Sequence, residues 1–321
     1  MMLNVGIIGA GAIAHKMAQT LSMMDGVCTY AVASRELLRA QEFAARWSVK
    51  RAYGSYEALV RDPKVNLVYI ATPHSHHYMH AMMALNADKA VLCEKSFTAD
   101  AQQAQALFDL ARSRGLFIAE AAWSKCTPLF FKVQELLETG VIGRPMQMYA
   151  SLCYDLRDKE RILRRDLCGG ALMDVGVYCL YFARMFFGGD VVQTMSNAVM
   201  GETGVDMFNS VCLRYADGKI ANLQSSALTN CNREGLICGD KGYIVVENIN
   251  CPEAVKVYRD YQLVETYYPE KDQLTGYEYE VRACKEALEK GWTETPLLSW
   301  SETMETMKQL DLIRSQWGLE W

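Results

Sequence analysis

The spacing of apolar and polar residues predicts alternating strands and helices through the first part of the chain. Short apolar runs, of the kind that forms strands buried on both faces, recur there, and stretches with helical periodicity separate them. Such alternation implies a parallel sheet. We expect strands at 5–8, 27–33, 65–71, 90–93 and 116–119, and helices at 12–21, 36–47, 56–61, 74–87 and 101–115.

The remainder of the chain has a different pattern. Segments from 191 to about 257 alternate in strand fashion, and Asp217-Gly218 and Asp240-Lys241-Gly242 are turn signals between them. This predicts a largely antiparallel open sheet with one face on helices. The other face, if apolar, needs a cover, so we expect a homodimer or higher homo-oligomer through this sheet. The expected strands are 146–154, 211–215, 221–228, 235–238 and 243–246, the helices 128–139, 171–187, 277–290 and 301–316, and a polar loop 155–168.

Composition narrows the class of protein. The chain has 321 residues, is 50% hydrophobic and 22% charged, and carries a net charge of −5, which is ordinary for two globular domains. No basic cluster suggests nucleic acid, and no apolar run is long enough to predict a membrane span. The absence of a signal-peptide layout and the 11 scattered cysteines favour a reducing cytoplasm.

A glycine turn between the first predicted strand and helix has the strongest chemical implication. Gly9 and Gly11 begin Gly-x-Gly-x-x-Ala, the fingerprint of a dinucleotide-binding turn. Gly9 permits the tight turn, Gly11 lets a pyrophosphate approach the backbone, and Ala14 lets the helix pack on the strand. The free amides at the helix start, at Ala12 and Ile13, would face the phosphates.

These patterns together predict an α/β protein with two domains. We expect an N-terminal Rossmann dinucleotide-binding domain at 1–120. A C-terminal α+β domain at 121–321, with a large, mostly antiparallel open sheet, would bind substrate and form the oligomer.

The end of the second predicted strand affects the choice of cofactor. Folds that bind NAD commonly place an Asp or Glu there for the ribose 2′-hydroxyl, but this strand ends Ala33-Ser34-Arg35. A hydroxyl and a guanidinium suit a 2′-phosphate. We therefore predict NADP as the preferred cofactor, and Glu36 keeps NAD possible.

Four histidines follow the third predicted strand, at His74, His76, His77 and His80. No nearby Cys or acidic residue completes a metal site, and Pro73 marks a helix start. Helix capping and contacts at the edge of the cofactor are therefore the preferred interpretation, and no metal is expected.

Glu94 and Lys95 stand where the strand at 90–93 ends. Ligands of doubly wound sheets bind beyond the carboxyl ends of the strands, so this pair is well placed for chemistry. The alternative is a solvated charge pair.

Motifs along nearly the whole chain resemble those of the glucose–fructose oxidoreductase / inositol dehydrogenase (Gfo/Idh/MocA) family. His74 stands where the family has Asn, Ser96 where it has Pro, and Cys168 where it has its first glycine. The motifs are Gly9-x-Gly11-x-x-Ala14, Thr72-Pro73-His74-x-x-His77, Val91-Leu92-Cys93-Glu94-Lys95-Ser96 and Gly169-Gly170-Ala171-Leu172-Met173-Asp174-Val175-Gly176-Val177-Tyr178.

Within that family, the chain is most similar to the dimeric dihydrodiol dehydrogenase / NADP-linked xylose dehydrogenase branch. The similarity rests on Tyr178, Glu120-Ala121-Ala122-Trp123 and Arg161-Ile162-Leu163. Lys125 stands where the branch has arginine, and Arg164-Arg165 replaces an Asp-Pro.

The resemblance implies an NAD(P)-dependent oxidoreductase that transfers hydride between the nicotinamide and a carbon bearing a hydroxyl or carbonyl. The substrate would be a sugar, a cyclic polyol or a vicinal diol. Glu94 would contact the ribose or nicotinamide end of the cofactor, and Trp123 would form a wall of the substrate pocket. The other residues implied in cofactor binding are Thr72, Pro73, His74, His77 and Lys95.

Proton transfer is assigned to Tyr178. Asp174 and Tyr178 are four residues apart on one predicted helix and so share a face, with Gly169-Gly170 leaving room beside them. Taken alone, a core tyrosine with a satisfied hydroxyl is the better interpretation, and the resemblance reverses it. A free phenol has a pKa of about 10, which the ammonium of Lys95 would lower. Asp174 would orient Lys95 or a substrate hydroxyl.

Two alternatives remain open. Rossmann folds also serve as non-catalytic NAD(P)-binding regulators, although a sensor does not need Lys95, Asp174 and Tyr178. Distant relatives within the resemblance use a tightly held NAD for hydrolysis.

Overall fold

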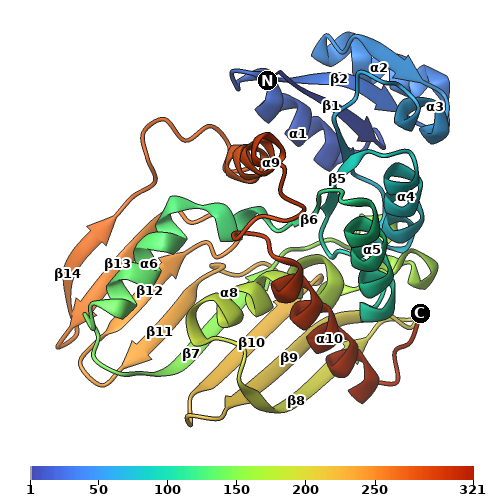
Figure 1. The fold of residues 1–321 in the computed structure, drawn as a ribbon. Coiled ribbons are helices and arrows are strands. Elements are labelled where there is room, and N and C mark those ends of the chain that lie inside the picture. Colours follow the sequence, from blue (N-terminus) through green and yellow to red (C-terminus); the bar gives the residue numbers. More distant parts are fainter. Residues whose placement is uncertain (1) are drawn as a thin grey trace. The chain divides into compact units, whose positions relative to one another are not determined.

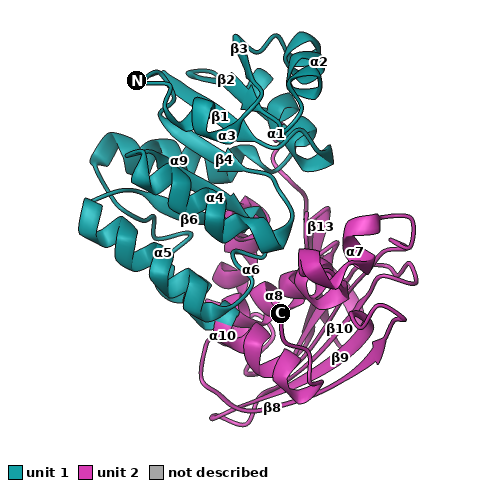
Figure 2. Cartoon of the chain, turned by 90° about the vertical axis from the view of Figure 1, so that its right-hand side faces the viewer, with its two compact units in different colours: residues 1–123, 274–307 teal, residues 124–273, 308–321 magenta. Residues whose placement is uncertain are grey.

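The chain forms two compact units in the computed structural model, which describes residues 2–321. The first unit contains the residues up to Trp123 together with Leu274–Met307, and the second contains Ser124–Gln273 and Lys308–Trp321 (Figure 2). Each unit is therefore discontinuous in sequence. The functions assigned to 1–120 and 121–321 remain predictions.

The described residues of the first unit form a sheet of six parallel strands in the order β3-β2-β1-β4-β5-β6. The order reverses between β1 and β4, which places a crevice at their carboxyl ends. β4 and β5 are wholly buried, as their apolar runs require. The strands are β1 (Leu3–Ile8), β2 (Val27–Ala33), β3 (Arg51–Tyr53), β4 (Leu67–Ile70), β5 (Ala90–Glu94) and β6 (Ile118–Ala121).

Local signals begin and end the helices of this unit. The side chains of Ser55 and Asp100 cap α3 and α5 by accepting from backbone amides. Gly115 and Gly291 take the left-handed conformation just past α5 and α9. The helices are α1 (Ala12–Ser22), α2 (Leu37–Trp47), α3 (Tyr56–Val60), α4 (His74–Asn86), α5 (Ala101–Arg114), α9 (Glu278–Lys290) and the first part of α10 (Trp300–Gln316).

The sequence pattern did not predict β3. Its three residues are exposed or half-buried and have no apolar run, so only pairing with β2 makes them a strand. β3 is the edge strand of the sheet, and Lys50 and Arg51 are exposed there. Charged side chains on an edge discourage pairing with another chain.

The described part of the second unit contains a sheet of eight strands in the order β14-β13-β12-β11-β7-β10-β9-β8. All neighbours are antiparallel except β7 and β10, which are parallel, so the predicted fold class is confirmed. β14 lies beyond the region predicted to form strands. The strands are β7 (Pro145–Cys153), β8 (Val191–Met200), β9 (Asp206–Tyr215), β10 (Ile220–Ser226), β11 (Gly235–Gly239), β12 (Tyr243–Glu247), β13 (Ala254–Arg259) and β14 (Gln262–Tyr267).

Helices cover one face of this sheet. α6 (Pro128–Glu138) packs on β13, and α8 (Val177–Phe187) packs on β7 and β10 (Figure 1). Alternate strand residues are buried, such as Met148 and Leu223. Their neighbours on the opposite face include Tyr149, Phe208 and Ile220, which are exposed. The opposite face of the sheet thus presents several apolar side chains to solvent.

The predicted helix at 171–187 is a compound element. Leu172–Gly176 forms a π-helical turn that runs directly into α8, and the polar loop before it contains the short helix α7 (Glu160–Leu163).

The stretch Arg165–Phe187 corrects one expectation. By length and composition it is apolar enough to cross a membrane, with a mean hydropathy of 1.3 in its most apolar window. However, 83% of that window is buried inside the protein. It is a core segment of the second unit.

Candidate functional site

The glycine turn leaves space and free donors at the start of α1. Gly9 has a φ of +100°, and a Cβ there would lie 2.7 Å from the carbonyl oxygen of Ala71. At Gly11, the N-cap of α1, no described atom would come within 4 Å of a Cβ. No side chain caps α1, so the amides that begin at Ala12 and Ile13 keep the donors that phosphates accept.

The end of β2 carries a hydroxyl and a cation. Ser34 is buried, with Oγ 3.5 Å from the amide of Glu36, whereas Arg35 is exposed. Arg35 lies near two rings that stack edge to face at 4.7 Å, Tyr56 and His80. Burial, then the charges of His76, His77 and Arg35, lower the pKa of His80 to about 4. A cation beside neutral rings suits a phosphate next to a flat base.

The histidines after β4 have structural partners. The ring nitrogens of His77 lie 3.0 and 2.8 Å from the carbonyl oxygens of Ser96 and Thr72, and the side chain is fully buried. Burial lowers the pKa of His77 to about 4, so it is uncharged at neutral pH. It ties the loop before α4 to the loop after β5. Within residues 2–321, no group of three or more His, Cys, Asp or Glu is arranged to hold a metal.

Glu94 and Lys95 differ in their surroundings. Glu94 is buried; it accepts a short hydrogen bond from the Tyr69 hydroxyl and another from the Lys95 amide at 3.2 Å. Burial, then the charge of Glu94, raises the pKa of Tyr69 well above its usual value. Lys95 itself is half-buried at the carboxyl end of the sheet. That Glu94 contacts the cofactor stays a prediction.

Two further buried carboxyl groups lie close to Glu94, and the sequence did not indicate them. Glu120 accepts from the Phe97 amide and the Thr303 hydroxyl, both at 3.1 Å. Glu280, on α9, is fully buried, and neither carboxyl oxygen has a hydrogen-bond partner in the described chain. Burial, then the charges of Glu94 and Glu120, hold the pKa of Glu280 well above its usual range. Burial thus favours the protonated form of Glu280.

Trp123 has an aromatic partner that the sequence did not indicate. Its ring stacks on Tyr277 at a centroid distance of 4.2 Å and an interplanar angle of 20°. Both side chains are mostly buried. No local pattern links two residues so far apart in the chain. The pair makes a flat apolar wall within the first unit.

Asp174 forms an ion pair within the second unit. Its two carboxylate oxygens accept from Arg161 at 2.7 and 3.2 Å, a bidentate contact. The Asp174 side chain is 9% exposed and that of Arg161 is 45% exposed. Tyr178 follows in the first turn of α8, buried, with its ring edge-to-face on Tyr181 at 5.9 Å.

Asp206 is a buried acid beneath this element. It is fully inaccessible, and burial raises its pKa to about 7 despite hydrogen bonds from Asn209 and the Leu172 amide. The sequence pattern placed this residue within the strand-rich region 191–257 and did not indicate a role for it.

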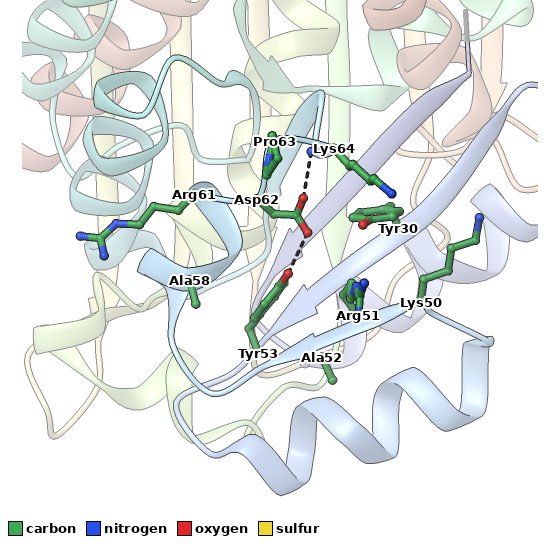
Figure 3. Close-up of a pocket in the computed structure, with 10 residues that line it drawn as sticks. All are labelled: Tyr30, Lys50, Arg51, Ala52, Tyr53, Ala58, Arg61, Asp62, Pro63 and Lys64. Carbon is green, nitrogen blue, oxygen red and sulfur yellow. Dashed lines mark hydrogen bonds between the residues drawn. The ribbon is translucent and has the colours of Figure 1, made fainter.

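The widest pocket characterised in the first unit lies elsewhere. It has a volume of about 590 Å³ and is open, beside the β2–β3 edge (Figure 3). Tyr30, Lys50, Arg51 and Lys64 line it with Asp62, which accepts from the Tyr53 hydroxyl at 2.7 Å. Its described lining includes none of the predicted site residues. That the site lies at the strand ends stays a prediction.

Sequence comparisons identify similar proteins for both units. Residues 3–121 match a family described as "Oxidoreductase family, NAD-binding Rossmann fold" (GFO_IDH_MocA), and residues 130–245 match the GFO/IDH/MocA C-terminal domain. Trans-1,2-dihydrobenzene-1,2-diol dehydrogenases from Homo sapiens and Mus musculus are each 33% identical to this chain. The alignments cover 99% of this chain and 98% of each relative.

Solved structures share the fold. KijD10, a 3-ketoreductase from Actinomadura kijaniata in complex with NADP and TDP-benzene, has a TM-score of 0.91 at 25% identity, over 98% of both chains. Its structures include one variant with a lysine replaced by alanine and another with a tyrosine replaced by phenylalanine. An aldose-aldose oxidoreductase from Caulobacter crescentus has a TM-score of 0.89 at 20% identity, over 98% of this chain and 97% of its own.

Asp206→Asn should make the stability of the protein less dependent on pH. An unfolded Asp titrates near 3.9, and burial raises the folded pKa to about 7. The folded state therefore holds the proton more tightly, and Asp206 lowers the free energy of unfolding as pH rises through this window, by roughly 4 kcal/mol at most.

Denaturant unfolding at about pH 4 and about pH 8 measures this effect. The Asn variant should lose the part of the decline that Asp206 contributes, whereas Asp217→Asn, at an exposed site, should retain it. A decline of wild-type size in the Asp206→Asn protein would contradict the assignment.

Proposed function

Because this chain belongs to the Gfo/Idh/MocA family and is an NAD(P)-dependent oxidoreductase acting on CH–OH groups, we propose that it interconverts the hydroxyl and carbonyl of a vicinal diol, cyclic polyol or sugar. NADP is the preferred cofactor. The observation that carries the cofactor proposal is the end of β2, where Ser34 and Arg35 stand in place of a carboxylate.

The residues at the strand ends fit a dinucleotide. The open space at Gly11 and the uncapped start of α1 would take the pyrophosphate. Arg35 would pair with the 2′-phosphate, for which an acidic side chain would be repulsive. His74, at the start of α4, and Thr72 and Pro73 before it would line the same edge.

When bound, the nicotinamide supplies or accepts the hydride, and the protein must move the alcohol proton. We assign that proton to the hydroxyl of Tyr178. The ammonium of Lys95 would favour the phenolate and so bring the phenol pKa closer to neutrality. Replacement of a lysine and a tyrosine in the solved ketoreductase structures is consistent with this choice.

Side chains of both units support a substrate with adjacent oxygens on a flat or cyclic frame. The stacked Trp123 and Tyr277 offer an apolar wall to such a frame. Asp174, held by two hydrogen bonds from Arg161, has a fixed orientation in which it could accept from a substrate hydroxyl. Named relatives act on a dihydrodiol, which combines these features.

The protein would assemble as a homodimer through the open face of the second sheet. Val199 and Phe208 are directly opposite each other on β8 and β9, and both are exposed with Tyr149, Met195 and Ile220. A broad apolar sheet face needs a cover in water. None of the 11 cysteines, all of which lie within the described residues, takes part in a disulfide bond, and this supports the reducing cytoplasm.

Calorimetric titration with NADPH and NADH tests the cofactor proposal. NADPH should bind at least about tenfold more tightly, or about 1.4 kcal/mol, and Arg35→Ala should remove most of that preference. Arg61→Ala, another exposed arginine, is the control and should keep it. Tighter binding of NADH by the unaltered protein would refute the 2′-phosphate assignment.

Tyr178→Phe should lower kcat by about 100-fold or more while binding of NADPH is unchanged, because it removes only the proton-transfer group. Lys95→Met should have a similar effect on kcat. Turnover is followed by nicotinamide absorbance with a panel of diols, polyols and aldoses.

Tyr215→Phe is the matched control for this prediction. Its buried hydroxyl has no partner in the described chain, so turnover should stay near the original value. Normal turnover by both Tyr178→Phe and Lys95→Met would remove the proton-transfer proposal.

The double variant Val199→Asp/Phe208→Asp should be a monomer in sedimentation-velocity experiments, since it places four charges in the paired face of a dimer. Leu38→Asp, at a residue 65% exposed on α2, should leave the oligomeric state unchanged. A stable dimer of the double variant would exclude this face.

A further inference from the structure

Polar side chains beneath the π-turn form one connected network. Oδ2 of Asp206 accepts hydrogen bonds from the Leu172 amide and from Nδ2 of Asn209, both at 2.8 Å. Oδ1 of Asn209 accepts from the Ser225 hydroxyl at 2.9 Å. These three side chains are at most 2% exposed. The network therefore connects β9 and β10 to the first residue of the π-turn.

The bond to Leu172 satisfies an amide that the helix itself cannot satisfy. The first N–H groups of any helix lack partners within it, and the Leu172 amide is buried with Asp206, which supplies the acceptor. A carboxylate at this position also complements the positive end of the helix dipole. Asp206 thus anchors the π-turn at its start.

Glycines at both ends let the π-turn rest directly on the network. Gly170 has a φ of +106°, and a Cβ there would lie 2.3 Å from Oδ1 of Asp206. A Cβ on Gly176 would lie 2.7 Å from the Ser225 hydroxyl oxygen. Both distances are shorter than real Cβ contacts. A larger residue at either position would therefore push the π-turn away from Asp206 or Ser225.

The supported turn determines where two candidate reactive groups stand. Asp174 lies inside it, and Tyr178 follows in the next turn of α8. A π-turn bonds residue i to i+5, whereas an α-helix bonds i to i+4. Loss of the π-turn would therefore rotate Asp174 relative to Tyr178 and to the sheet below.

We propose that Asp206, acting with Asn209 and Ser225, is a positioning residue that holds Leu172–Gly176 in its π-helical form and so places Asp174 and Tyr178. An apolar residue would fill the same space without the burial penalty that Asp206 carries. The hydrogen bonds that Oδ2 of Asp206 accepts and the bond from Ser225 to Asn209 are directional, so they favour one arrangement of the backbone. The effect on turnover rests on the proposed function, but the effect on the π-turn does not.

Two variants of Asp206 distinguish a role in positioning the π-turn from a role in folding alone. Asp206→Ala removes the acceptor, whereas the amide oxygen of Asp206→Asn can still accept from both the Leu172 amide and Asn209. Hydrogen exchange of the 171–178 amides should be at least about tenfold faster in the Ala variant and close to the original in the Asn variant. With a working substrate, kcat should fall about tenfold to 100-fold in Asp206→Ala, with NADPH binding unchanged, and Asp206→Asn should restore it.

The outcomes separate the two proposals. If the unaltered protein turns over no substrate, the proposed function fails, and the exchange rates still decide the role of Asp206. If Asp206→Ala folds and keeps both exchange and kcat within about twofold, or if Asp206→Asn is as impaired as Asp206→Ala, the positioning role is wrong.

A second pair of variants covers the case in which Asp206→Ala does not fold. Gly176→Ala should quicken exchange of the 171–178 amides and lower kcat, because its Cβ meets the Ser225 hydroxyl. Adding Ser225→Ala removes that oxygen and should recover part of both. Equal effects of the single and double variants would overturn the proposal.

Discussion

The first unit depends on one close backbone contact, where β1 ends against the end of β4. A Cβ on Gly9 would lie 2.7 Å from the Ala71 carbonyl oxygen, so only glycine allows the chain to turn there. The Gly9 amide donates to Ala33 and the Ala71 amide to Ile8, both at 2.9 Å, so the turn is bonded to both neighbouring strands. This contact aligns the start of α1, the end of β2 and the Glu94-Lys95 corner along one edge of the sheet. The residues predicted to bind the cofactor stand at or just after the ends of β1, β2, β4 and β5.

Both sheets must bury the apolar side chains of their strands, and they do so in different ways. In the first, parallel strands such as β4 are wholly buried and therefore read as continuous apolar runs. In the second, antiparallel strands alternate, with Leu223 inside and Ile220 outside. The outward residues of the second sheet are often apolar, so this face of the sheet needs a partner surface that covers it from water. That difference is why the oligomer is proposed to form through the second sheet and not the first.

Both units contain buried acids whose pKa values are raised by burial. Glu280 lies near Glu94 and Glu120, and Asp206 lies beneath the π-turn. Burial raises the pKa of each, because the charged form of each carboxyl group is costly to hold away from water. Polar groups of this kind are concentrated where position matters more than stability. In the second unit, the hydrogen bond from the Leu172 amide to Asp206 is the contact through which such a group is proposed to position the backbone.

The sequence by itself determined the features that arise from short-range physics. These features are the alternation of apolar runs and helices, the glycine turn before the first helix, and the hydroxyl and guanidinium at the end of β2. Each of them depends only on residues that are close together in the sequence. Tertiary structure alone decided which distant residues meet: Tyr277 on Trp123, Glu280 beside Glu94, and Asp206 under Leu172. It also made β3 a strand, because its hydrogen bonds come from β2 and not from any pattern of its own. Burial, and hence the pKa of a carboxyl group, is set by everything that surrounds it in space, and no local spacing of residues carries that information.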